Sequence, residues 1–495
     1  MDHVLEERIR KLEAWRGRGV RAYPYAYGRT HTTAAVRAEE AALGDREVAI
    51  AGRLMTLRGH GKTCFAHLQD GSGRLQVYAR RDDLGDDRFD NWSLLEVGDH
   101  VGARGTLFRT KTGELTLHVR DFELLSKALR PLPDKWHGLA DKEVRYRQRY
   151  VDLIVNPEVR EVFVRRSRIV STFRRELESR GFLEVETPVL QPLYGGASAR
   201  PFVTRHNALD MQLYLRIAPE LYLKRLLVGG FEGVFEVARN FRNEGMDRSH
   251  NPEFTMLELY VAYWDYEDMM RMTETVLREV ARAAGAENPS WGGHELDFTA
   301  PFRRIGFVPA LEAALGEPVR GRDAAALRAL AHRHHLDAAP DDSVARLLDT
   351  LFGGLVEPAL VQPTFVVDYP KELSPLAKDH RSEPGLVERF ELYAAGMELA
   401  NAFSELNDPI EQRARFEAQV RLRAGGDLEA HPMDEDYLRA LEYGMPPAGG
   451  LGIGIDRVVM LLTGSASIRD VLLFPAMRPE SGEASAEGAE PPAPA

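Results

Sequence analysis

The sequence has a single cysteine, Cys64, and no long apolar run. One cysteine excludes an intrachain disulfide and a cysteine-rich zinc site. No apolar stretch approaches the roughly 20 residues that a helix needs to span a bilayer. The N-terminus, MDHVLEERIRKLEAWRGRG, mixes acids with bases and lacks the apolar segment of a signal peptide. We therefore expect no membrane contact and a cytoplasmic location.

The chain also lacks an excess of positive charge, since its net charge at pH 7 is -12. Phosphate neutralisation by Lys and Arg supplies most non-specific affinity for nucleic acids. The acidic balance argues against a general nucleic-acid coat protein. It remains compatible with an enzyme that binds one structured RNA through local basic patches.

A chain of 495 residues is too long for one hydrophobic core, so we expect two or more domains. Residues 3–18 carry apolar side chains at three- and four-residue spacing, which predicts an amphipathic helix. The segment 47–125 then changes to a period of two, with turns between short runs. These runs are 48–54, 64–68, 75–79, 100–107 and 115–124. Five strands in so short a segment predict a small barrel, and the oligonucleotide-binding (OB) barrel is one such architecture.

The rest of the chain mixes long helices with strands, which indicates an α+β domain. The predicted helices are 158–180, 264–284, 323–335 and 408–424. A proline-rich connection at 130–134 precedes this part, and the last stretch, SGEASAEGAEPPAPA, has the composition of a disordered tail. The predicted division is 1–130 (helix and barrel), 131–145 (linker), 146–480 (α+β domain) and 481–495 (tail).

Two glycine motifs fail on spacing. Gly61-Lys62-Thr63 resembles the end of a P-loop, but Thr56 stands where the first glycine is required. The run from Gly450 to Gly454 resembles a dinucleotide fingerprint, but Ile455 stands where the third glycine is required. The sequence therefore excludes a P-loop NTPase and a Rossmann dehydrogenase.

The first segment with dense charge among apolar residues is VARNFRNE (237–244), followed by HNPEFTMLELY (250–260). Strand alternation places Phe254, Met256, Glu258 and Tyr260 on one face. A carboxylate and a phenol then share a side with an aromatic ring and a thioether. The alternative is an exposed hairpin with solvated charges.

The second segment, RFELYAAGMELANAFSE (389–405), predicts a hairpin turning at Ala395-Gly396. Such a turn pairs residue 391 with 400 and 393 with 398. Glu391 and Glu398 then lie diagonally on one face, where two unpaired carboxylates repel unless a divalent cation joins them. The alternative is a pair of ordinary surface glutamates.

The third segment is GGLGIGIDR (449–457), which continues into an apolar helix. Its glycines allow another group to approach the strand backbone closely. Arg457 at the helix start, directed back toward that strand, is suited to bind a phosphate. The alternative is a packed strand-turn-helix with an Asp cap.

In this order the three segments resemble the class II aminoacyl-tRNA synthetases. FRNE (241–244) with HNPEFT (250–255) resembles motif 2 of that family, GLGIGIDR (450–457) resembles motif 3, and GFLEVETP (181–188) resembles the motif 1 helix and strand of the dimer interface. The likeness extends from the N-terminal helix to about Pro479. GGASARPF (195–202), RIAPELYLK (216–224) and SELND (404–408) are similar to the lysine-specific members.

The resemblance implies a mainly antiparallel catalytic sheet flanked by helices, joined to an OB-fold anticodon-binding barrel, in a homodimer. It implies that ATP and L-lysine form lysyl-adenylate, from which lysine passes to tRNA(Lys). By resemblance, Arg242 and Arg457 are the catalytic residues that grip the phosphates, and Mg²⁺ is held by Glu391 and Glu398. The implied ATP-binding set is Arg242, Glu244, His250, Asn251, Phe254, Glu391, Glu398 and Arg457.

For lysine, the resemblance implies that Glu405 with Tyr260 binds the ε-ammonium. The implied set is Gly196, Glu220, Glu258, Tyr260, Asn401, Phe403 and Glu405, and the implied anticodon-binding residues are Arg58, Phe65 and Gln76. Ala400 and Ala402 depart from the glycines of many bacterial members, and Met397 replaces a basic residue.

Three other functions remain open at this stage. The first is a ligase of the same class for aspartate or asparagine. The second is a lysine ligase that modifies a protein, although such relatives resemble the catalytic domain alone. The third is a non-catalytic RNA-binding or regulatory paralogue.

Overall fold

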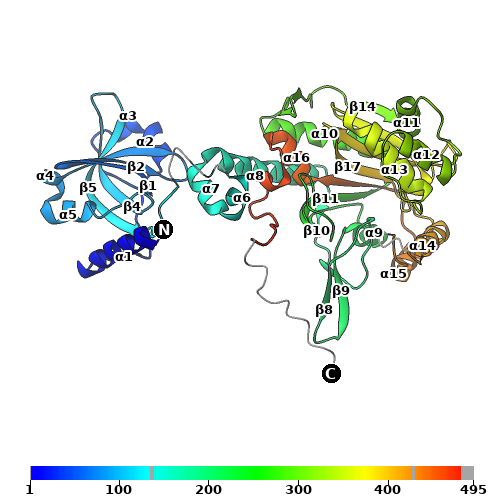
Figure 1. Cartoon of the computed structure of the whole chain (residues 1–495), viewed down its shortest axis with the longest axis horizontal. Coiled ribbons are helices and arrows are strands. Elements are labelled where there is room, and N and C mark those ends of the chain that lie inside the picture. The colour runs from blue at the N-terminus through cyan, green and yellow to red at the C-terminus, as the bar shows by residue number, and fades with distance from the viewer. Residues whose placement is uncertain (1, 134–138, 140, 425–429, 481–495) are drawn as a thin grey trace. The chain divides into compact units, whose positions relative to one another are not determined.

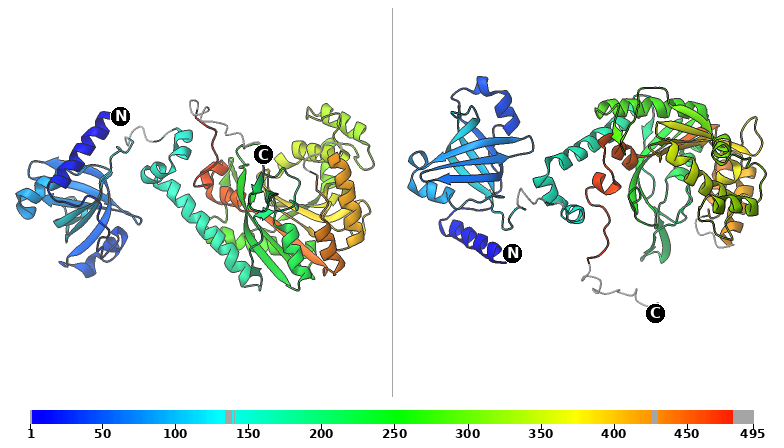
Figure 2. Two further views of the ribbon diagram at one scale, coloured as in Figure 1. Left: turned by 90° about the horizontal axis from the view of Figure 1, so that it is seen from below. Right: turned by 45° about the horizontal axis from the view of Figure 1, so that its top comes forward.

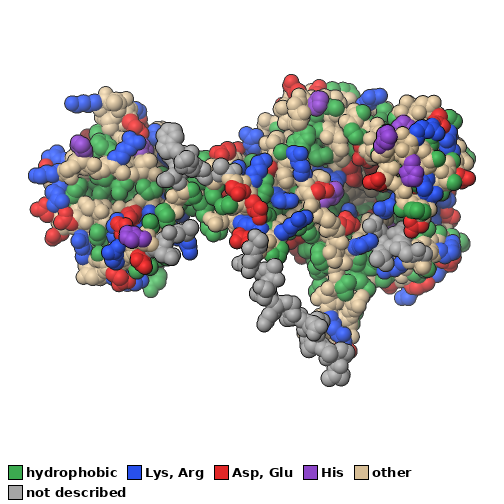
Figure 3. Space-filling model, viewed as in Figure 1, with side chains coloured by type: hydrophobic (Ala, Val, Ile, Leu, Met, Phe, Trp, Pro, Cys, Tyr) green, Lys and Arg blue, Asp and Glu red, His purple; other side chains and the backbone are tan. Residues whose placement is uncertain are grey.

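The computed structural model describes residues 2–133, 139, 141–424 and 430–480, which form two compact units, Met1–Ala140 and Asp141–Ala495 (Figure 1). The tail predicted at 481–495 lies outside the described residues. Across the described part of the chain, no helix is long and apolar enough to cross a membrane. On the face drawn in Figure 3, acidic and basic side chains are interspersed over each unit.

The first unit is a closed five-stranded barrel with the strand order β1-β2-β3-β5-β4, which confirms the predicted barrel. Its strands are β1 (Val48–His60), β2 (Thr63–Gln69), β3 (Arg74–Arg80), β4 (His100–Arg109) and β5 (Leu115–Ser126). Its helices are α1 (Asp2–Gly17), α2 (Thr33–Ala38), α3 (Glu40–Leu43), α4 (Arg81–Leu84) and α5 (Asp86–Trp92). Every second residue of β2 and β3 faces the core, and Cys64 is one of these buried residues.

Glycine permits two close contacts that shape the barrel. Gly105 of β4 pairs with Val119 of β5, where the ladder changes register, and a Cβ at this position would lie 1.8 Å from the His118 carbonyl oxygen. Gly102 of β4 faces the ring of Tyr27, which would lie 2.4 Å from a Cβ. The strand therefore tolerates no side chain at either position without moving its neighbours.

The second unit is built on an eight-stranded sheet in the order β14-β15-β16-β17-β18-β11-β10-β6. Its strands are β6 (Leu183–Glu184), β10 (Gly233–Phe241), β11 (Glu253–Ala262), β14 (Arg303–Gly306), β15 (Thr364–Pro370), β16 (Leu386–Ala394), β17 (Met397–Ser404) and β18 (Ala448–Gly454). Only the edge pairs β14–β15 and β10–β6 are parallel, so the predicted antiparallel platform is confirmed. A smaller sheet joins β7 (Leu190–Gln191), β9 (Met211–Leu215) and β8 (Val203–His206), and β12 (Ser290–Trp291) pairs with β13 (His294–Glu295).

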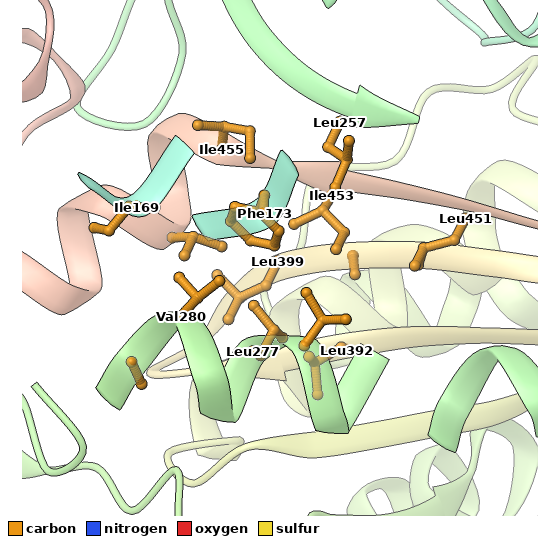
Figure 4. Close-up of a cluster of buried hydrophobic side chains, with 14 of the residues drawn as sticks. Ile169, Phe173, Leu257, Leu277, Val280, Leu392, Leu399, Leu451, Ile453 and Ile455 are labelled. Atoms are coloured by element: carbon orange, nitrogen blue, oxygen red, sulfur yellow. The ribbon is translucent and has the colours of Figure 1, made fainter. Parts of the chain in front are cut away.

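Helices cover one face of this sheet completely. Ile169 and Phe173 of α8, Leu277 and Val280 of α10 and Ile455 of α16 pack against Leu257, Leu392, Leu399, Leu451 and Ile453 of the strands (Figure 4). The bounds are α8 (Pro157–Glu178), α10 (Tyr266–Ala283), α16 (Ile455–Thr463) and α17 (Ile468–Val471), preceded by α6 (Lys142–Arg147) and α7 (Arg149–Val155). Figure 2 shows α8, in teal, running beside the strands.

The opposite face is covered only toward its two sides. At the β15–β16 side lies a cluster with α11 (Phe307–Leu315), α12 (Ala324–Arg333) and α13 (Val344–Leu355). At the β10–β11 side lies a second cluster with α9 (Glu220–Val228), α14 (Pro409–Ala424) and α15 (Glu435–Glu442). Phe403 of β17 contacts both clusters, and the strands between them form the floor of a cavity.

The hairpin of β16 and β17 corrects one predicted pairing. Ala395 and Gly396 have φ angles of 52° and 70°, as a tight hairpin turn requires, and Tyr393 pairs with Glu398 as predicted. Residue 391, however, pairs with Asn401 and not with residue 400. The reason is a β-bulge, which leaves Leu399 as an extra residue in β17.

We expect Gly105→Ala to destabilise the barrel unit by about 3 kcal/mol or more, because the strands must separate to admit the methyl group. Gly59→Ala in β1 is the control, since no atom lies within 4 Å of a Cβ there. Calorimetric unfolding of the full chain measures both variants. Equal midpoints for the two would contradict the tight packing at Gly105.

Candidate active site

The cavity above the sheet has a volume of about 370 Å³ and collects residues from all three charged segments. Every residue of the predicted ATP-binding set lines it, and so does every residue of the predicted lysine-binding set except Glu405. The alternation predicted for β11 is present, because Phe254, Met256, Glu258 and Tyr260 all line the cavity.

Glu405 lies directly behind the cavity floor. It follows β17 and is 1% exposed. A Cβ on Gly450, which lines the cavity, would lie 1.9 Å from Glu405 Oε1 and 2.5 Å from the Tyr260 ring. The carboxylate therefore reaches the floor through the space that the glycine leaves open.

Three guanidinium groups line the cavity, and two of them, Arg242 and Arg457, belong to the predicted phosphate-binding set. Arg457, at the start of α16, donates to the backbone oxygen of Glu398 at 2.8 Å and to its carboxylate at 3.2 Å. Its second amino group lies 3.1 Å from His250 Nε2. Arg242 lies over the Phe254 ring at 5.1 Å. Its buried Nε has no hydrogen-bond partner among the described residues, and the residue lines the cavity.

Three buried carboxylates, Glu220, Glu258 and Glu405, gather at the other charged part of the site. Burial raises the pKa of Glu258 to about 8, and the nearby charge of Glu220 adds to this shift. Burial also raises the pKa of the Tyr260 phenol, which donates to Glu258 at 3.3 Å. Glu405 Oε1 has no hydrogen-bond partner within the described part of the chain, while Oε2 forms an ion pair with Lys224. Carboxylates in such surroundings favour a cationic ligand.

Glu391 and Glu398 both line the cavity despite the bulge. Glu391 accepts hydrogen bonds from the phenols of Tyr369 (2.8 Å) and Tyr393 (2.5 Å), and from Arg389 (2.5 Å). Burial raises the pKa of Glu391. The positive charge of Arg389 lowers this pKa, and the negative charge of Glu398 raises it. These hydrogen bonds fix the orientation of the Glu391 carboxylate, and Glu398 provides a second carboxylate in the cavity lining.

Arg389 and Lys224 are site residues to which the sequence reasoning gave no role. Arg389 lines the cavity and holds both Asn401, at 3.0 Å, and Glu391. Arg389 stands two residues before Glu391 in the predicted strand, so alternation places both side chains on one face and could have identified Arg389 from the sequence. Lys224 lies one helical turn after Glu220, at the spacing of an ion pair.

The departures from the family pattern avoid the cavity. Ala400 and Ala402 lie in the core on the helix-covered face. Asn401 and Phe403, which alternate with them along β17, line the cavity. Met397 also packs against that core. The substitutions therefore change the packing under the sheet and leave the ligand face intact.

The predicted anticodon residues lie on the outer side of the barrel. Arg58 pairs with Phe65 across β1 and β2, and Phe65 pairs with Tyr78 of β3. The Phe65 and Tyr78 rings lie 4.7 Å apart and half-buried, outside the barrel core. Gln76 accepts from Thr116 at 2.7 Å. This face offers aromatic rings beside polar groups.

Comparison with known proteins agrees with this geometry. The family described as "tRNA synthetases class II (D, K and N)" matches residues 141–478, and "OB-fold nucleic acid binding domain" matches 48–125. The chain belongs to the class II tRNA synthetases, as its motifs predicted.

Relatives identify the branch of the class. The chain is 55% identical to the lysine–tRNA ligase of Carboxydothermus hydrogenoformans over 97% of this chain and 99% of the relative. Identity to the lysine–tRNA ligase of Pelotomaculum thermopropionicum is 54%, over 97% and 96%. For that of Methanoculleus marisnigri it is 51%, over 99% of both chains. Within the class, the chain belongs to the lysine–tRNA ligases.

We expect Gly450→Ala to raise the KM for lysine more than about tenfold, because the methyl group displaces Glu405 and Tyr260 from the cavity floor. Gly454→Ala in the same strand is the control, since its Cβ would meet no atom closer than 3.7 Å. Lysine-dependent ATP–pyrophosphate exchange measures both. A normal KM for the Gly450 variant would contradict the placement of Glu405.

Proposed function

We propose that the cavity joins L-lysine to ATP as lysyl-adenylate and that a hydroxyl oxygen at the 3′ end of tRNA(Lys) then takes the lysyl group, with release of AMP. The observation that carries this proposal is the pairing of two kinds of site in one cavity. The guanidinium groups of Arg242 and Arg457 suit a triphosphate, and the buried carboxylates beside them suit an amino acid with two ammonium groups.

In the first step a lysine carboxylate oxygen attacks the α-phosphorus of ATP. A bond forms between that oxygen and phosphorus, and the bond to the bridging oxygen breaks to release pyrophosphate. Arg242, which lines the cavity, holds the α-phosphate and the lysine carboxylate. Arg457, with His250 beside it, holds the γ-phosphate end. Alignment and charge neutralisation supply the catalysis.

The nucleotide base lies against Phe254 in this proposal, with a guanidinium on its other side. Arg457 is assigned to that second side. The guanidinium carbon of Arg242 lies 5.1 Å from the centre of the Phe254 ring. Glu244 and Asn251, which line the cavity, contact the nucleotide.

The amino acid lies with its ε-ammonium at Glu405 and Tyr260. Glu220 and Glu258 hold the α-amino group, and Gly196 lets the chain pass close to Glu220 because its φ is +86° and a Cβ there would lie 2.8 Å from the Glu220 side chain. Asn401 and Phe403 shape the remaining wall. A site built for two ammonium groups leaves carboxylates unpaired when aspartate or asparagine enters.

Glu391 and Glu398 fit a magnesium ion that also binds ATP phosphates. Within the described ranges no group of three or more His, Cys, Asp or Glu side chains forms a complete metal cage. Mg²⁺ does not need one, because it commonly takes one or two carboxylates and completes its shell with phosphates and water. When bound, the ion neutralises phosphate charge. Tyr369, Tyr393 and Arg389 orient Glu391 for this role.

The barrel binds the anticodon in this proposal, with Phe65 stacking on a base and Arg58 and Gln76 meeting phosphate or base edges. The half-exposed pair of Phe65 and Tyr78 supports this. Such an enzyme acts in the cytoplasm, where tRNA is charged.

ATP–pyrophosphate exchange with single amino acids tests the function. We expect exchange with L-lysine and about a hundredfold less with L-aspartate or L-asparagine, because their side chains leave Glu405 Oε1, next to the cavity floor, without a cation. Arg242→Ala should abolish the lysine signal, and transfer to tRNA(Lys) should follow in the wild type. Exchange with aspartate alone, or none with any amino acid, would refute the proposal.

We further propose that the chain forms a homodimer through the face of α8 and the small sheet. A hollow of about 1010 Å³ on this face is lined by apolar residues that include Phe163, Val170, Phe241 and Phe474. Phe474 is 76% exposed and Val203, near Phe202 of the lining, is 60% exposed. Exposed apolar side chains beside charged ones such as Arg174 and Glu253 are typical of an interface between subunits.

Phe474→Arg should shift the chain from dimer toward monomer, because it places an unpaired charge in the apolar interface. Ile410→Arg in α14 is the control, since Ile410 is 82% exposed and lies outside the lining of the hollow. Light scattering distinguishes the monomer mass of 55.6 kDa from twice that value. A monomeric wild type, or no difference between the variants, would exclude this interface.

A further inference from the structure

Lys224, a residue of the chain itself, occupies the carboxylate cluster assigned to the substrate. Its side chain is 0% exposed, and Nζ donates to Glu220 Oε1 at 2.6 Å. The same ammonium forms an ion pair with Glu405 Oε2. Lys224 thus joins the carboxylate assigned to the α-amino group with the one assigned to the ε-ammonium.

The rings and helices around Lys224 fix the ammonium in place. Nζ lies 5.2 Å from the Phe403 ring centre and 5.8 Å from that of Tyr260. His431 and Tyr437 are buried beside it. Burial and the charge of Lys224 lower the pKa of His431 to about 4, so the imidazole is neutral near pH 7. Of these two basic side chains, Lys224 is therefore the one that carries a positive charge beside the carboxylates.

The two oxygens of Glu405 face different partners. Oε2 pairs with Lys224, which does not line the cavity. Oε1 lies against Gly450, and Gly450 lines the cavity. Lys224 thus fixes the carboxylate from behind and leaves its second oxygen toward the cavity.

Charge balance indicates why a lysine stands here. Glu220, Glu258 and Glu405 carry up to three negative charges once a cationic ligand favours ionisation of Glu258, whose pKa of about 8 is raised by burial, and Lys224 offsets one of them. Two charges remain for the two ammonium groups of a bound lysine, while Arg242 balances the carboxylate of the substrate. Without Lys224 the buried cluster holds one carboxylate more than the substrate can pair, which is costly in a low-dielectric site.

We propose that Lys224 is a positioning residue that matches the pocket to a substrate with two ammonium groups, by taking up one carboxylate charge and fixing Glu405. The inference rests on the proposed lysine site. It adds a determinant of amino-acid affinity that does not touch the substrate.

Lys224→Met tests the proposal in the full-length protein. We expect the KM for L-lysine in ATP–pyrophosphate exchange to rise about tenfold or more, because Glu405 loses its fixed partner and the excess carboxylate becomes protonated. The KM for ATP should stay within about twofold, since the phosphate-binding groups are untouched. An unchanged KM for lysine, or an equal rise for both substrates, would overturn it.

Lys127→Met is a matched control from the barrel. Lys127 is also 0% exposed and pairs with two acids, Glu96 at 2.6 Å and Asp99 at 3.0 Å. Its loss should lower the unfolding temperature without changing either KM. A similar rise in the KM for lysine would show that general destabilisation explains the Lys224 result.

A second pair of variants guards against misfolding and tests the charge count. Lys224→Gln keeps a hydrogen-bond donor but not the charge, and it should raise the KM for lysine as Lys224→Met does. Combining Lys224→Met with Glu220→Gln removes one charge of each sign. The KM for lysine of the double variant should therefore not exceed the higher of the two single-variant values. Normal lysine affinity in Lys224→Gln, or fully additive losses, would overturn the proposal. Absence of lysine-dependent exchange in the wild type would instead refute the proposed function.

Discussion

The close approach of Glu405 to the backbone of β18 is the contact on which the amino-acid end of the site depends. It exists because Gly450 has no side chain, so that Glu405 Oε1 and the Tyr260 ring both lie against the strand. Burying a carboxylate costs several kcal/mol unless a cation pairs with it. Lys224 offsets part of this negative charge, and in the proposed function the charge that remains favours a cationic substrate.

The sheet gives these charges a fixed frame by using its two faces differently. One face packs against α8, α10 and α16 and forms the largest core (Figure 4). The other is covered at its two sides by separate clusters, which leaves the middle strands as the cavity floor. Because β10, β11, β18 and β17 lie in this order in the sheet, Arg242, Glu398 and Arg457 line one cavity although they are distant in sequence.

Much of this architecture was predictable from local patterns. The alternation of 254–260 placed Phe254 and Glu258 on the ligand face, and the helical period located α8 and α10 to within two residues. Such signals are reliable because they depend on each segment's own backbone geometry. The pairing of Glu391 was wrong by one residue, because a bulge at Leu399 depends on packing across strands that the hairpin sequence does not express.

The sequence by itself determined the class of protein, the two-part organisation and about half of the residues that line the cavity, because these follow from family motifs and from periods of two and 3.6 residues. Only the tertiary structure decided how those residues are paired. It brought Lys224 to Glu405 across 181 positions of chain, and it directed Ala400 and Ala402 away from the ligands. Burial and charge pairing between distant segments are properties of packing, and no local pattern carries them.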